Sequence, residues 1–187
     1  SLVGSEMCIR DRVQGIYSAP GKAVKEAYDS AGVVANDRGI TVWLKGNRVS
    51  RNQIMAIKEE SVTDQKNSLT VCLDNILRHA GITRNTEYDL AQGKTAIQIL
   101  EENMTGVQVL DLSGCSLDAV LYYVNQDIPV LAILEDGEAV LVTGFNEFNV
   151  VIMEPSTGKL YKKGMNDATT WFAENGNHFI SYMKIDN

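Results

Sequence analysis

Cysteine and histidine carry the most reactive side chains of this sequence, and there are few of them. The chain holds three cysteines, Cys8, Cys72 and Cys115, and two histidines, His79 and His178. There is no Cys-x-x-Cys pair and no histidine pair at helical spacing. The sequence therefore predicts neither a metal site nor a cofactor, and any chemistry has to come from a few single positions.

Cys72 is the first candidate nucleophile, and its place in the pattern argues against that role. The apolar residues around it recur at helical spacing behind Ser68, a good N-cap, and the helix is expected to end at Gly81. A thiolate is stabilised at a helix N-terminus, but Cys72 lies one turn inside, on the apolar stripe. We interpret it as a core residue.

Neither histidine is well placed as a base for Cys72. His79 follows it by two helical turns, roughly 10 Å by helix rise, whereas proton transfer needs about 3 Å. Its spacing favours contact with free carbonyl groups at the helix end, and His178 is interpreted as a polar residue at a strand edge. Cys115 precedes a helix start and could be reactive, but no base is near it in sequence, so packing is favoured.

Composition limits the possible partners. The chain has 187 residues and a net charge of −7, with no basic stripe, which argues against a nucleic-acid partner. No apolar run approaches the ~20 residues that a membrane span requires. The length is enough for one domain with an appendage.

The first twelve residues are treated separately. The stretch LVGSEMCIRD resembles the translation of a transposon adapter used in shotgun DNA sequencing. Residues 1–12 are therefore expected to be non-native and to pack on nothing, with the true chain beginning near Val13. A signal peptide or anchor upstream would then be missing from the sequence.

Two units are expected after that segment. Residues 13–57 predict a small β-α-β-β subdomain: a strand at 13–17, a helix after Pro20 ending at Gly32, and a hairpin around Asn36-Asp37-Arg38-Gly39. Its topology weakly resembles half of a peptidoglycan-binding envelope domain; the alternative is an appended subdomain that packs on the second unit. A strand at 54–57 and a polar linker at 58–67 are expected to follow.

Residues 68–187 predict helices first and an antiparallel sheet afterwards, which is typical of an α+β domain. The expected helices are at 68–80, 86–92, 96–103, 116–124 and 166–174. The expected strands are at 107–111, 129–134, 139–144, 149–153, 159–163 and 178–185.

This order resembles the papain-fold peptidase domain of the bacteriocin-processing (C39-like) type. Gln126-Asp127-Ile128-Pro129-Val130-Leu131 resembles the family's buried strand entry. Glu138-Ala139-Val140-Leu141-Val142-Thr143-Gly144-Phe145 resembles the strand that begins with the catalytic histidine. Val151-Ile152-Met153-Glu154-Pro155-Ser156-Thr157-Gly158 resembles the Asp-Pro segment that orients it. The resemblance implies an α+β, papain-like fold over about 120 residues.

The catalytic positions implied by the resemblance hold other residues. Glu138 stands at the histidine position and Glu154 at the aspartate position; counting back from Gly81 puts Ser68, or with a slipped alignment Cys72, at the nucleophile position. Gln65 resembles the oxyanion-hole glutamine only relative to Cys72. Ser68 with two carboxylates is not a credible triad, because a carboxylate is a poor base for a serine hydroxyl.

The resulting hypothesis is a catalytically degenerate peptidase-fold module that binds a peptide or a protein partner in a bacterial cell envelope or outside the cell. Glu138 and Glu154 would make the floor of its cleft acidic. Two alternatives are an active cysteine peptidase that uses Cys72 and a purely structural domain of a larger protein.

Overall fold

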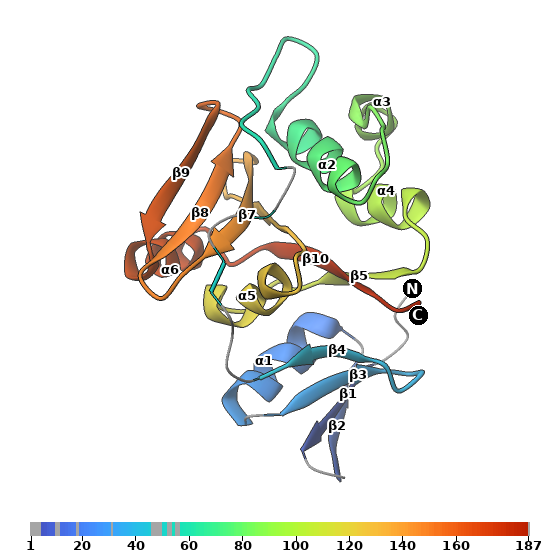
Figure 1. Cartoon of the computed structure of the whole chain (residues 1–187). Coiled ribbons are helices and arrows are strands. Elements are labelled where there is room, and N and C mark those ends of the chain that lie inside the picture. Colours follow the sequence, from blue (N-terminus) through green and yellow to red (C-terminus); the bar gives the residue numbers. More distant parts are fainter. Residues whose placement is uncertain are drawn as a thin grey trace.

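Two antiparallel sheets and six helices make up the part of the chain that the structure describes (Figure 1). The computed structural model describes residues 5–9, 12–17, 19–30, 32–45, 50, 51, 54 and 57–186. No helix within these residues is both long enough and apolar enough to cross a bilayer. The mixture of helices and antiparallel strands is the α+β architecture expected from the sequence.

The first sheet has four strands in the order β2-β1-β3-β4, with α1 packed on it. Its elements are β1 (Ser5–Ile9), β2 (Arg12–Tyr17), α1 (Pro20–Ser30), β3 (Val33–Asn36) and β4 (Thr41–Leu44). The β-α-β-β order expected for residues 13–57 is present, but β1 precedes it and pairs with both β2 and β3. The expectation that residues 1–12 pack on nothing is therefore wrong for 5–9, whereas the origin of the segment stays a prediction.

The first unit packs on the second through β5 (Val107–Asp111) and the helix α5 (Leu117–Asn125). The indole N–H of Trp43 donates to the carbonyl oxygen of Ala119 over 2.9 Å, and the hydroxyl of Tyr123 donates to the carbonyl oxygen of Val42 over 2.8 Å. Both aromatic side chains are fully buried. Because buried polar groups are costly without partners, these reciprocal bonds fix the two units against each other.

The second sheet has six strands in the order β5-β10-β6-β7-β8-β9. Its strands are β5 (Val107–Asp111), β6 (Val130–Ile133), β7 (Ala139–Phe145), β8 (Asn149–Glu154), β9 (Lys159–Gly164) and β10 (Phe179–Lys184). The helices of this unit besides α5 are α2 (Ser68–His79), α3 (Glu87–Ala91), α4 (Ala96–Asn103) and α6 (Met165–Glu174). Each of these elements lies within a few residues of its expected position.

Strand β7 is at the centre of the core. All seven of its residues are buried, and because side chains alternate between the faces of a strand, both faces must be covered. The helices α2 and α5 both pack against β7. Strand β7 is thereby held in the core by these two helices.

Two local expectations differ from the structure. No strand forms at Ile54 or Ile57, which are buried single residues; Arg51 makes an isolated bridge to Phe145, and residues 55 and 56 lie outside the described residues. The N-cap of α2 is Asn67, whose side chain accepts from the Thr70 N–H over 2.9 Å, so Ser68 is the first residue of the helix. This shift frees the Ser68 hydroxyl for a different contact.

Candidate functional site

The Ser68 hydroxyl joins the start of α2 to the start of β7. Its oxygen accepts a hydrogen bond from the backbone N–H of Ala139 over 2.8 Å, and the residue is buried. Because Asn67 already caps the helix, Ser68 is not needed as the cap and can satisfy the first amide of the strand instead. The bond sets Ser68 beside Glu138, which immediately precedes Ala139.

A cavity of about 420 Å³ lies over this junction. The residues that line it come from the segment before α2, the start of that helix, the β6–β7 turn and the β8–β9 turn: Val62, Thr63, Asn67, Ser68, Glu138 and Ser156. Most of these side chains end in a hydroxyl, an amide or a carboxylate. Ser68 and Glu138, two of the positions singled out in the sequence, are thus brought together.

The segment before α2 is docked to the β8–β9 turn. The Val62 N–H donates to the carbonyl oxygen of Pro155 over 3.1 Å, and Ser61 lies against Gly158. Gly158 has a φ of +69°, and a Cβ there would clash with the Ser61 side chain, so both the turn and the close approach require glycine. The expected linker at 58–67 therefore forms one wall of the cavity.

Glu154 lies outside the lining of this cavity. One of its carboxylate oxygens accepts from the Thr157 hydroxyl over 2.9 Å and the other from the Tyr161 hydroxyl over 3.1 Å. Burial and the neighbouring Glu154 carboxylate raise the pKa of Tyr161 to about 12. Glu154 is thus held within its own hairpin and does not line this cavity with Glu138, so an acidic floor formed by both carboxylates stays a prediction.

Cys72 and Gln65 also lie outside the cavity lining. Cys72 is completely buried, and burial raises the pKa of its thiol well above the ordinary value, with further contributions from Glu60 and Glu138. A catalytic thiol requires the opposite shift. The Gln65 side chain is exposed, and its backbone N–H donates to the Thr63 hydroxyl over 3.3 Å.

Both histidines are described, and neither lines the cavity at Ser68. The Nε2 of His79 lies 2.8 Å from the carbonyl oxygen of Asp127, at the far end of α2. The sequence predicted a contact with a carbonyl group at the end of α2, the helix that ends at His79. The carbonyl group instead belongs to Asp127, in the segment that leads into β6. His178 is half exposed, and its Nε2 lies 3.6 Å from a carboxylate oxygen of Glu135.

A buried carboxylate that sequence reasoning missed supports the helix behind the site. Asp74 is 1% exposed, and one oxygen accepts both the backbone N–H and the hydroxyl of Thr86, each over 2.9 Å. The other oxygen accepts from the Lys66 ammonium over 3.0 Å, and this bond raises the pKa of Lys66. The sequence did contain a signal for this ion pair. Asp74 lies among the apolar residues of a helix, and Lys66 precedes it by eight residues.

Groups of metal-ligating side chains are absent from the described part of the chain. No cluster of three or more histidine, cysteine, aspartate or glutamate residues is arranged to hold an ion there. Cys72 and Cys115 are both free and buried. The cavity at Ser68 consequently offers hydrogen-bonding groups and one carboxylate rather than a metal or thiolate centre.

Comparison with known proteins defines the fold. No family model matches the sequence, and no curated protein does. Among solved structures, a crystal structure from Bacillus anthracis described as a C39-like peptidase matches with a TM-score of 0.58 and 16% sequence identity, over 76% of this chain and all of that chain. About three quarters of the chain thus shares the fold of that C39-like peptidase, the papain-like α+β architecture expected from the sequence.

Proposed function

We propose that the chain is a catalytically inactive peptidase-fold module that binds peptides in the cavity between Ser68 and Glu138. The observation that carries this proposal is the 2.8 Å hydrogen bond from the Ala139 N–H to the Ser68 hydroxyl. It joins the start of α2 to the start of β7, the two positions that the sequence resemblance assigns to the nucleophile and the imidazole, and it sets the Glu138 carboxylate beside Ser68.

The absence of a base at the cavity supports the lack of catalysis. General-base catalysis needs the base within hydrogen-bond reach of the nucleophile. The sequence has two histidines, and Figure 1 places the end of α2, where His79 lies, away from the start of β7. The buried Cys72 argues in the same direction, because neither a substrate carbonyl nor a base can reach its sulfur.

The lining of the cavity supports peptide binding. Thr63, Asn67 and Ser156 are exposed and offer hydroxyl and amide groups that can bond to a peptide backbone. Glu138 is half-buried and is the single charged residue of the lining. We therefore expect an extended peptide whose lysine or arginine side chain, or free amine, pairs with Glu138. Such pairing should be weak and should decrease with salt.

Titration with two matched peptides tests the proposal. The peptides differ only in one lysine replaced by glutamine, and binding is followed by NMR or calorimetry at low and at high salt. We expect the lysine peptide to bind about threefold to tenfold more tightly at low salt. Glu138→Gln should remove this preference. Glu154→Gln is the matched control, since it makes the same charge change outside the cavity and should leave the preference intact.

Three results would contradict the proposal. Neither peptide binds; both peptides bind equally to the unmodified protein; or Glu154→Gln weakens binding as much as Glu138→Gln does. The first result would favour a purely structural domain. The location in or outside a bacterial cell envelope that was expected from the sequence stays a prediction.

A further inference from the structure

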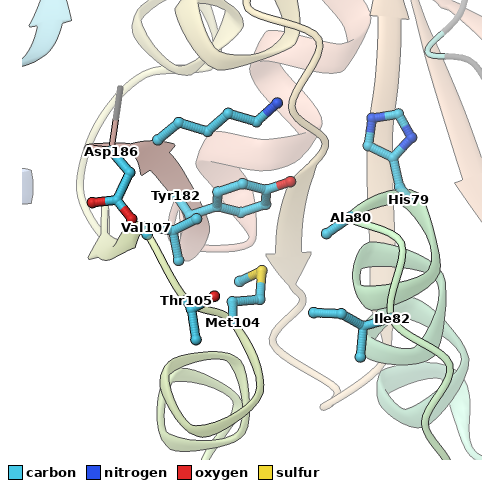
Figure 2. A pocket seen from close by; sticks show the side chains of 10 residues that line it. His79, Ala80, Ile82, Met104, Thr105, Val107, Tyr182 and Asp186 are labelled. Atoms are coloured by element: carbon cyan, nitrogen blue, oxygen red, sulfur yellow. The ribbon is translucent and has the colours of Figure 1, made fainter.

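A second cavity lies at the opposite end of α2 from Ser68. Its volume is about 460 Å³, which is within the range of small-molecule sites. Residues from the end of α2, the α4–β5 connection and β10 line it: His79, Ala80, Ile82, Met104, Thr105, Gly106, Val107, Tyr182, Lys184 and Asp186 (Figure 2). Eleven residues of helix separate His79 from Ser68, about 16 Å by helix rise, so the two cavities are distinct.

Tyr182 presents an unused hydroxyl to this cavity. The residue as a whole is 2% exposed, and no described residue forms a hydrogen bond with its phenol oxygen, which is open to the cavity rather than sealed in the core. Figure 2 shows the oxygen pointing across the cavity toward Ala80. Burial and the Asp127 charge raise the pKa of Tyr182, so the phenol keeps its proton at neutral pH. The hydroxyl is therefore available to donate to an oxygen atom of a ligand bound in the cavity.

The wall around this hydroxyl is apolar apart from Thr105 and the His79 imidazole, whose Nδ1 is buried without a hydrogen-bond partner among the described residues. Ala80 is the C-cap of α2 and Ile82 follows it, while Met104 and Val107 face them from the α4–β5 connection and the start of β5 (Figure 2). Met104 is 6% exposed. A ligand that reaches Tyr182 must therefore place an apolar group between these side chains. Methionine adapts easily to the shape of such a group.

The rim of the cavity carries one charge of each sign. Tyr182, Lys184 and Asp186 follow one another at a spacing of two, so they project to the same side of extended chain. Lys184 and Asp186 are exposed, and within the described residues neither forms an ion pair. The backbone N–H of Ile185 donates to the Gly106 carbonyl oxygen over 2.9 Å, and a Cβ at Gly106 would clash with the Asp186 carboxylate. Glycine there lets Asp186 lie close against the rim.

We propose that this cavity binds a free α-amino acid with an apolar side chain. The side chain packs between Ile82, Met104 and Val107, the carboxylate pairs with Lys184 and bonds to the Tyr182 hydroxyl, and the ammonium group pairs with Asp186. The two rim charges are unpaired in the free protein, and a zwitterion neutralises both at once. This inference does not rest on peptide binding at Ser68.

Three ligands that share the leucine side chain separate the contribution of the ligand's carboxylate from that of its ammonium group. Leucine carries both charges, N-acetyl-leucine only the carboxylate, and leucine amide only the ammonium group. We expect leucine to shift the backbone amide NMR signals of Gly106 and Ile185, with binding about tenfold tighter than that of either analogue. Lys184→Met should abolish the advantage of leucine over leucine amide, and Asp186→Asn should abolish its advantage over N-acetyl-leucine.

Tyr182→Phe should weaken leucine binding several-fold without unfolding the protein, since it removes only the hydroxyl. Glu138→Gln, in the other cavity, should leave leucine binding unchanged. The proposal is overturned if leucine shifts none of these signals at concentrations up to about 10 mM. Equal binding of N-acetyl-leucine and leucine would overturn it too and would identify a site for carboxylates alone.

Discussion

The hydroxyl oxygen of Ser68 accepts the backbone N–H of Ala139 over 2.8 Å, and both residues are buried. The bond joins the first residue of α2 to the first residue of β7 and so fixes the position of Glu138 at the edge of the cavity. A serine hydroxyl used in this way holds two elements together. The resemblance to papain-like domains puts the nucleophile position at Ser68 or, with a slipped alignment, at Cys72, and this assignment stays a prediction.

Replacing Ser68 by alanine should lower the stability of the protein. The buried N–H of Ala139 would lose its partner, which costs about 1–3 kcal/mol and lowers Tm by roughly 2–4 °C per kcal/mol for a chain of this size. Thermal unfolding measures the change. Ser156→Ala is the matched control, because this exposed serine lines the same cavity and should leave Tm nearly unchanged. Equal Tm values for the two variants would contradict a structural role of Ser68.

Deleting residues 1–9 should also destabilise the protein. Strand β1 lies between β2 and β3, so its removal leaves β2 without a neighbour in the sheet and exposes an edge of β3. We expect a drop in Tm of several degrees, corresponding to ~1–2 kcal/mol or more. An unchanged Tm would show that β1 contributes nothing and would support the adapter interpretation of the segment.

Stability should fall in alkaline solution, in part through Cys115. Burial raises the pKa of this thiol from 9.0 to about 12. The unfolded chain therefore loses the proton first as the pH rises, so the contribution of Cys115 to stability is complete below pH 9 and is lost between pH 9 and about 12. Urea unfolding at several pH values measures the slope.

Cys115→Ser removes this titration. Between pH 9 and the raised pKa, the dependence of unfolding free energy on pH should become shallower by about 1.4 kcal/mol per pH unit. The comparison uses slopes, so a constant loss of stability from the substitution itself does not affect it. Identical slopes for the two proteins would show that the Cys115 thiol is not shielded from water in the folded state.

The helices and strands of the second unit could be predicted from sequence because their periodicity is strong and local. The helix at 96–103 and the strand at 107–111 have the expected bounds. Strand β1 could not be predicted by the same means, since its residues were set aside on the resemblance to adapter sequence. The N-cap of α2 was misplaced by one residue because Asn67 and Ser68 are both good caps, and only the position of Ala139 distinguishes them.

The candidate site was predictable in part for a similar reason. Ser68 and Glu138 each stand at a recognisable element start, and the structure brings both to one cavity, whereas their correspondence to the family's catalytic positions stays a prediction. Glu154 also matched a motif, but its hydroxyl partners Thr157 and Tyr161 lie on the following turn and strand, and no pattern reports such contacts. The second cavity, which Tyr182 lines, forms where the end of α2 faces β10. These segments lie about a hundred residues apart, so no local sequence pattern predicts the cavity.

The most direct test of the account is whether the protein cleaves peptides. A mixture of unstructured peptides is incubated with the protein at pH 7, and mass spectrometry records any new peptide ends over a day. We predict none, for the unmodified protein and equally for Ser68→Ala and Cys72→Ala. Cleavage by the unmodified protein that disappears in either variant would contradict the account and would make His178 the first base to replace.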